Sequence, residues 1–174
     1  VRLAHGAEGI RRVAQRPEHA DAQPGLDALV GATDPVVDRH VHLGLETGSD
    51  RVLRLLRKPG SAAQAEGLVR TLKAAGLSLG VIVMTGIGGR ALAEEHIGQT
   101  ADLLNRLPLD RRDRISLSEF EPDPLSPYVR EGLADLLDRP TCQQQSRDLR
   151  SRLRFGAWPA GPVVSHYDVQ QFVY

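Results

Sequence analysis

The spacing of apolar residues in the central part of the chain predicts alternating strands and helices. Apolar and other residues alternate along 41–46, which is typical of a strand with one buried face. The run 79–84, LGVIVM, is nearly all apolar and predicts a strand buried on both faces, as in a parallel sheet. A third strand is predicted over 115–120. Apolar residues at helical spacing predict helices over 62–75 and 91–107 between these strands.

Residues that favour helix ends support these boundaries. The segment 48–50, Gly-Ser-Asp, offers capping oxygens of Ser49 and Asp50 to a short helix predicted over 51–57. Ser61 precedes the next helix, and Gly76 follows it in the position where glycine commonly ends a helix. The order strand–helix–strand–helix–strand predicts right-handed β–α–β units, and therefore an α/β fold with a parallel sheet.

The same patterns divide the chain into three parts. Residues 1–37 are rich in helix-breaking residues and are expected to form an irregular N-terminal segment. Residues 38–130 hold the three predicted strands. Beyond them the pattern loosens, with helices predicted over 128–137 and 143–155. We therefore expect 131–174 to form a C-terminal helix and an aromatic tail.

The composition narrows the possible partners. The 22 Lys and Arg residues balance the 22 Asp and Glu residues, so no net charge attracts phosphate backbones and we expect no nucleic-acid partner. The basic helix predicted around 147–154 could contact RNA, but it lacks interleaved aromatic residues and a net positive domain, so we favour a structural role for it. Apolar runs of only a few residues argue against a membrane partner. The single cysteine, Cys142, excludes an internal disulfide and favours a reducing, cytoplasmic location.

The segments that follow the predicted strands form the candidate functional site. Ligands of parallel α/β sheets bind at the carboxyl ends of the strands. The segments there are 46–49, the glycine turn 86–89, and Glu119 with the proline-rich turn after it. Glycine backbone can approach a ligand closely and offer N–H groups, but the same glycines also suit a tight turn alone. Their spacing does not match the phosphate-binding or dinucleotide-binding fingerprints.

Histidines on the first predicted strand suggest a second kind of chemistry. His40, His42 and Glu46 share one strand face, so three possible metal ligands point the same way. We favour the alternatives that they are polar interior residues near a cofactor or core histidines with satisfied hydrogen bonds, and we expect no metal ligand in this chain. The segment 94–96, Glu-Glu-His, lacks the second histidine of a zinc-binding helix.

Three stretches of the sequence resemble parts of one enzyme family. HLGLETGSDRVL at 42–53, followed by RKP at 57–59, is similar to the fourth strand and helix of radical S-adenosylmethionine (radical SAM) enzymes. VMTGIGG at 83–89 is similar to the fifth strand and its glycine turn, and EPDPLSPY at 121–128 resembles the stretch after the sixth strand. The resemblance implies that 38–130 form strands four to six, with their helices, of a partial (β/α)6 TIM-like barrel, followed by a C-terminal helical or irregular extension.

The resemblance also implies an activity and its cofactors. Radical SAM enzymes use a [4Fe-4S] iron–sulfur cluster and S-adenosylmethionine (SAM) to generate a 5′-deoxyadenosyl radical that acts on a substrate, which is unknown here. Glu46 matches a residue that contacts the ribose of SAM, and Lys58 matches a basic residue that pairs with its carboxylate. Gly86 and Gly88 match the turn beside the adenine, and Ser49 belongs to the same cofactor-binding set.

The chain departs from the family in its cysteines. The family holds its cluster with three cysteines of a CxxxCxxC loop, whereas Cys142, the only cysteine here, lies after the matched region. We therefore expect the cluster ligands and the N-terminal half of the barrel to lie outside this chain, which would be inactive alone. The missing half is the expected partner, because the open edge of the sheet would otherwise favour dimers or aggregates.

The third predicted strand carries the residues expected to face the substrate, and the sequence also leaves two alternative functions open. Glu119, with the strand residues Ser116 and Ser118 before it, is expected to face the substrate because it lies at the carboxyl end of a strand. One alternative is a non-catalytic α/β module, derived from such a barrel, that binds a nucleotide-like ligand or a partner chain. The other is a fragment of an unrelated α/β barrel whose glycine turn binds phosphate.

Overall fold

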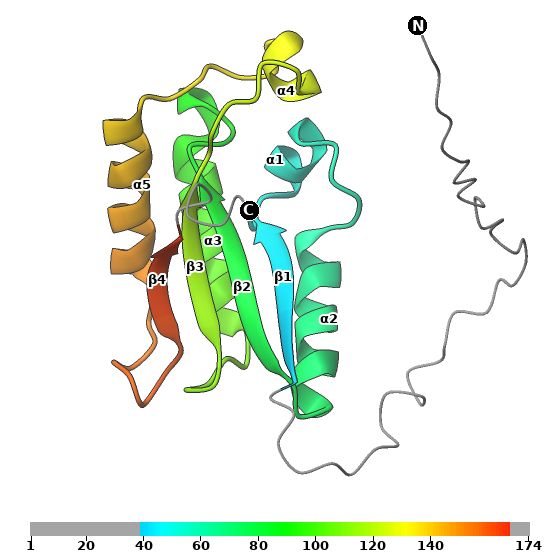
Figure 1. Ribbon diagram of the computed structural model, residues 1–174, viewed down its shortest axis with the longest axis vertical. Helices are drawn as coiled ribbons and strands as arrows, with labels where there is room; N and C mark the ends of the chain where they lie inside the picture. The colour runs from blue at the N-terminus through cyan, green and yellow to red at the C-terminus, as the bar shows by residue number, and fades with distance from the viewer. Residues whose placement is uncertain (1–38, 168–174) are drawn as a thin grey trace, which may run out of the picture. The chain divides into compact units, whose positions relative to one another are not determined.

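The computed structural model describes residues 39–167, and the expected irregular segment 1–37 and the end of the aromatic tail lie outside the described residues. The elements in chain order are β1 (His40–Glu46), α1 (Asp50–Leu55), α2 (Ala62–Ala74), β2 (Ser78–Thr85), η2 (Arg90–Leu92), α3 (Ala93–Arg106), β3 (Arg114–Glu119), α4 (Pro127–Arg130), α5 (Arg139–Arg152) and β4 (Val163–Tyr167). Strands and helices alternate around a parallel sheet, which confirms the α/β class expected from the sequence (Figure 1). None of the helices within 39–167 is long and apolar enough to cross a membrane.

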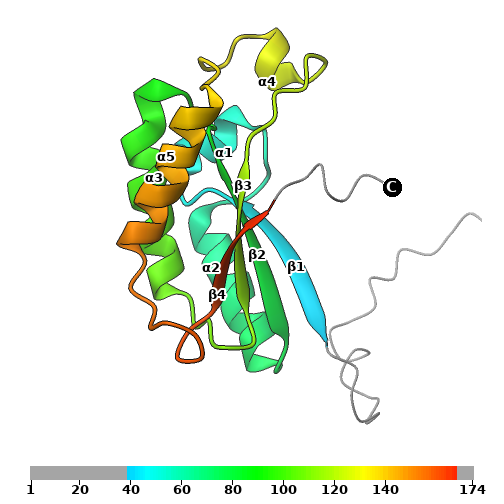
Figure 2. The same cartoon turned by 60° about the vertical axis from the view of Figure 1, so that its left-hand side comes forward.

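The sheet has the strand order β1-β2-β3-β4, and every neighbouring pair of strands is parallel. Leu43 of β1 pairs with Val81 of β2, which in turn pairs with Ile115 of β3. Because the strands follow one another in chain order through right-handed connections, the connecting helices gather on one face of the sheet. Figure 2 shows α2, α3 and α5 together on that side.

The apolar core lies between the sheet and these helices. Leu45, Val83 and Leu117 point toward the helices and pack in one cluster with Val69 of α2 and Leu149 of α5. Each of these five side chains is 4% exposed or less. Burial of a side chain of this size stabilises a fold by about 1.5–3 kcal/mol. The alternation of apolar and other side chains along each strand therefore determines which face of the sheet carries the helices.

The opposite face of the sheet carries mainly small and polar residues together with two larger apolar ones, and we call it the open face. None of the helices within residues 39–167 covers it (Figure 2). Strand alternation places on the open face the residues His40, His42, Gly44, Gly80, Ile82, Met84, Ser116 and Ser118. A ligand that binds at the carboxyl ends of the strands can therefore reach this face without displacing a helix.

The C-terminal third differs from the sequence expectation. The helix predicted over 128–137 is limited to α4, because the chain turns at Gly132, whose φ of 59° lies in the left-handed region. Helix α5 begins earlier than predicted, since Asp138 caps it by accepting a hydrogen bond of 2.9 Å from the backbone N–H of Thr141. Strand β4 was not predicted at all, and it extends the sheet beyond β3.

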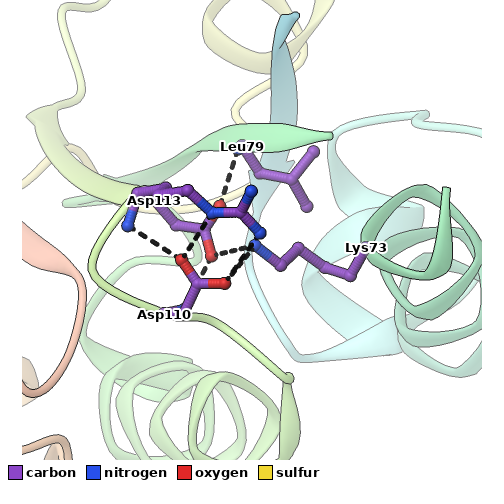
Figure 3. Close-up of polar contacts among 5 residues, drawn as sticks. Lys73, Leu79, Asp110 and Asp113 are labelled. Carbon is purple, nitrogen blue, oxygen red and sulfur yellow. Dashed lines mark hydrogen bonds and ion pairs between the residues drawn. The ribbon is translucent and has the colours of Figure 1, made fainter. Parts of the chain in front are cut away.

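A buried ion pair joins the elements at the amino-terminal end of the sheet (Figure 3). Lys73 of α2 lies with its Nζ 2.7 Å from Asp113 Oδ2 and 3.0 Å from Asp110 Oδ2. Asp113 also accepts hydrogen bonds from the backbone N–H groups of Leu79, at 2.8 Å, and Asp110, at 2.7 Å. One carboxylate therefore connects the end of α2, the start of β2 and the loop before β3.

Candidate functional site

Glu46 and Lys58 form an ion pair at the carboxyl end of β1. Lys58 Nζ donates a hydrogen bond of 2.6 Å to Glu46 Oε1. The Lys58 side chain is 41% exposed and the Glu46 side chain only 10%. The second carboxylate oxygen, Glu46 Oε2, is buried and has no hydrogen-bond partner. The pair therefore combines a reachable ammonium group with an acceptor oxygen that the protein itself leaves unused.

The backbone at Glu46 is unusual for a residue other than glycine. Its φ of 62° lies in the left-handed region, and the pairing of β1 with β2 is irregular between Gly44 and Glu46. Left-handed backbone at such a residue costs on the order of 1–3 kcal/mol and is found mainly at functional sites. The side chain lies over Gly44, where an added Cβ would be 2.8 Å from Glu46 Oε1. Gly44, which the sequence did not single out, therefore makes room for the carboxylate.

Ser49 is fully buried and uses its hydroxyl within the protein. The Oγ atom accepts a hydrogen bond of 3.2 Å from the backbone N–H of Val52, which caps α1, and donates one of 2.6 Å to Glu95 Oε1. The capping role expected from the sequence is confirmed. The contact between Ser49 and a cofactor stays a prediction.

A buried hydrogen-bond chain holds the loop after β1 against α3. His96 Nε2 is 2.9 Å from the carbonyl oxygen of Met84, which only accepts, so Nε2 carries the proton and Nδ1 accepts from Thr47 Oγ1 at 2.8 Å. Burial lowers the pKa of His96 to about 4, so the ring is neutral at pH 7. The backbone N–H of Gly48 donates to Thr100 Oγ1 at 2.8 Å. The loop that begins directly after Glu46 is therefore fixed in place.

The glycine turn after β2 also has internal partners. The N–H of Gly86 donates to Gln145 Oε1 at 2.8 Å, and the N–H of Gly88 donates to the Tyr128 hydroxyl at 2.9 Å. Both glycines have positive φ, 92° and 83°. A Cβ on Gly86 would lie 2.5 Å from Cys142 Sγ, so the close approach of α5 also requires glycine there. The approach of this turn to adenine stays a prediction.

Glu119 lies on the helix side of the sheet. Its Oε2 is 3.4 Å from Arg139 Nε, at the start of α5, and its Oε1 is 3.7 Å from His166 Nε2. Strand alternation explains this position, because Glu119 follows Leu117, which packs in the core. The neighbouring Ser118 is instead on the open face, where it is 2% exposed and its Oγ has no hydrogen-bond partner.

The remaining candidates from the sequence lie apart from this arrangement. Cys142 is buried beside the glycine turn, and burial raises the pKa of its thiol. His40 and His42 are exposed at the other end of β1, with their ring centroids 4.8 Å apart. Within residues 39–167, no group of three or more His, Cys, Asp and Glu side chains is arranged to hold a metal ion.

Comparison with known proteins adds no family assignment. The sequence matches no model of a known protein family, and a search of curated proteins finds no similar one. The interpretation of the site therefore depends on its geometry and on the motif resemblance.

Proposed function

We propose that this chain is the second half of a radical SAM barrel and that it binds SAM at the carboxyl end of β1. The observation that carries the proposal is the pair of Glu46 and Lys58. These residues, which the resemblance assigns to the ribose and the carboxylate of SAM, are 12 positions apart and lie 2.6 Å from each other. The left-handed backbone of Glu46 supports a functional role for this residue.

The topology of the sheet supports the barrel. In a (β/α) barrel, successive parallel strands lie side by side, the helices cover the outside, and the other face of the strands lines the interior. A doubly wound sheet would carry helices on both faces. The strand order β1-β2-β3-β4, with α2, α3 and α5 on one side, agrees with a section of barrel wall.

The chemistry of the donor set fits SAM. Glu46 Oε2 can accept a hydrogen bond from a ribose hydroxyl, which would satisfy a buried oxygen that has no partner. An ammonium group has three donors, and Lys58 uses one of them for Glu46. The other donors of Lys58 are free to bind the carboxylate of the methionine part, on the exposed side of the pair.

The residues of this chain do not fit the iron–sulfur cluster. A [4Fe-4S] cluster needs several thiolates, whereas the chain has one cysteine, Cys142, which is buried behind the glycine turn. The proposal therefore assigns the cluster ligands to a part of the protein outside this chain. Glu46 and Lys58 bind and orient SAM.

The proposal is tested by the dissociation constant of SAM, measured by isothermal titration calorimetry on the purified chain. Glu46→Gln and Lys58→Met should each weaken binding by about 10-fold or more, because each removes a charge-assisted hydrogen bond. The control is Glu94→Gln on α3, whose side chain is 81% exposed and pairs only with Arg152 in the described part of the chain. A folded chain that does not bind SAM, or that binds it equally well in all variants, would contradict the proposal.

A second measurement separates an enzyme from a binding module. Iron, sulfide and the low-temperature EPR spectrum are determined on the longest form of the protein, reconstituted without oxygen, with and without SAM. A reduced cluster signal that changes when SAM is added supports the enzyme. Binding of SAM without any cluster would instead favour the non-catalytic module.

A further inference from the structure

Glu46 lies at the centre of a tight turn of the backbone. The backbone N–H of Thr47 donates a hydrogen bond of 2.7 Å to the carbonyl oxygen of Leu45, two residues before it. Together with the φ of 62° at Glu46, this bond defines a γ-turn of the rare form with positive φ. Such a conformation persists only where the surrounding structure holds it in place. The contacts of the neighbouring residues therefore decide how firmly the Glu46 carboxylate is aimed.

Thr47 and His96 supply contacts that hold this turn. Thr47 is fully buried, and its Oγ1 accepts a hydrogen bond of 3.0 Å from the backbone N–H of Ser49 and donates one of 2.8 Å to His96 Nδ1. His96, which is also fully buried, donates from Nε2 to the carbonyl oxygen of Met84 at 2.9 Å. Met84 is the last residue but one of β2, so a single imidazole connects the turn after β1 to the end of the neighbouring strand.

Apolar packing alone does not explain this arrangement. Replacing both partners of a buried hydrogen bond by apolar groups of the same shape is nearly neutral for stability, so a fold does not need such a pair to remain folded. A hydrogen bond differs from an apolar contact because it fixes direction as well as distance. The bonds at both ring nitrogens fix the plane of the imidazole, and the imidazole fixes the hydroxyl of the residue that follows Glu46.

We propose that His96 is a positioning residue, which acts through Thr47 to hold the γ-turn that aims the Glu46 carboxylate over Gly44. This inference rests on the proposed function, because the carboxylate is aimed at the ribose of the bound nucleoside. Without the bond to His96, the strained turn relaxes in the free chain, and ligand binding then has to restore it. A site that is ordered before binding avoids this cost, so losing the bond lowers the affinity.

The test measures the dissociation constants of SAM and adenosine by isothermal titration calorimetry at pH 7. His96→Gln, whose amide can keep the bond to Met84 but leaves Thr47 without its acceptor, should weaken the binding of both ligands by about 3- to 10-fold. Both are affected because both contain the ribose. Thr47→Val should give the same loss, and Thr47→Ser, which keeps the hydroxyl, should recover most of it. The control is Ile115→Val at the amino-terminal end of β3, which removes one buried methyl group away from the turn and should leave both affinities unchanged.

A double variant separates positioning from a general loss of stability. If His96 acts through Glu46, then His96→Gln should leave both affinities nearly unchanged in a chain that already carries Glu46→Gln, whereas independent effects would add. Hydrogen exchange followed by NMR gives a readout without ligand. In His96→Gln, the amide of Thr47 should exchange about 5- to 10-fold faster relative to the amide of Leu79, at the other end of the sheet.

The outcomes distinguish the inference from the proposed function. If the unmodified chain binds SAM and His96→Gln binds it equally well, the inference is wrong and the proposed function stands. Additive losses in the double variant, or equal acceleration of exchange at Thr47 and Leu79, would also overturn the inference, since His96 would then stabilise the fold in general. If the unmodified chain binds neither ligand, the proposed function itself fails and the inference fails with it.

Discussion

Replacing Asp113 by alanine should lower the free energy of unfolding by about 3–5 kcal/mol, the range found when one partner of a buried ion pair is removed. The side chain is fully buried and receives three donors, from Lys73 and from the backbone N–H groups of Leu79 and Asp110. All three donors lose Asp113 as an acceptor in the variant. Among the described residues, Lys73 then keeps the half-exposed Asp110 as its partner.

The converse variant, Lys73→Met, should be less destabilising. Methionine replaces the apolar stem of the lysine, and the Asp113 carboxylate keeps both backbone donors. Each of these two hydrogen bonds contributes about 1 kcal/mol. Lys73→Met should therefore cost about 2 kcal/mol less than Asp113→Ala, since it removes the contacts of the ammonium group with Asp113 and Asp110 but neither backbone hydrogen bond.

Urea unfolding at pH 7 measures these differences as shifts of the transition midpoint at constant m-value. The control is Arg112→Met, which removes an ion pair to Asp110 between side chains that are 54% and 42% exposed, and it should change stability by less than about 1 kcal/mol. If Lys73→Met proves as destabilising as Asp113→Ala, the two backbone hydrogen bonds do not carry the stability assigned to them and the reasoning is refuted.

Three other predictions concern His96, Gly48 and Gly67. Burial lowers the pKa of His96 from its usual value of 6.5 to about 4 in the folded chain, so only the unfolded state gains a proton between these values. His96 should not affect the free energy of unfolding above pH 6.5, and below this pH it should lower that free energy by about 3 kcal/mol toward pH 4. In urea unfolding, the His96→Gln variant should lack this decline. Gly48→Ala should destabilise by about 1–3 kcal/mol, because its Cβ would lie 2.7 Å from the Cα of Thr100. Gly67→Ala, with nothing within 4 Å of the added Cβ in α2, should instead stabilise by about 0.5–1 kcal/mol, and equal melting temperatures for the two variants would contradict both expectations.

The regular elements of 39–120 were predictable because their signals are local. The alternation along 41–46 and the apolar run 79–84 place two strands within one residue of their observed bounds. Strand β4 was missed because it is short and stands beside an aromatic stretch, and its place in the sheet depends on pairing with β3. Pairing between strands that are far apart in the chain produces no clear local sequence pattern in a short segment.

Some side-chain positions of the site follow from the local sequence, whereas others depend on contacts that only the fold creates. The alternation that predicts β3 already places Ser118 and Glu119 on opposite faces of the strand, whereas the sequence analysis expected both residues to face the substrate. The role of His96 could not be predicted from the sequence, because its partner Thr47 is 49 positions away and only the fold brings the two residues together. The need for glycine at position 44 likewise could not be predicted, because it arises from the Glu46 carboxylate, which lies over Gly44 in the folded chain.

The strained backbone of Glu46 links stability to the proposed binding of SAM. At φ of 62°, alanine should be about as strained as glutamate, by about 1–2 kcal/mol, whereas glycine adopts this region freely. Glu46→Gly and Glu46→Ala remove the same carboxylate, so both should lose SAM affinity to the same extent in calorimetry. Glu46→Gly should nevertheless be more stable than Glu46→Ala by about 0.5–1 kcal/mol in urea unfolding, after the larger entropy of glycine in the unfolded chain is subtracted. An alanine variant that is the more stable of the two would show that the backbone at this position is not strained, and the carboxylate alone would then remain as the reason for placing the site there.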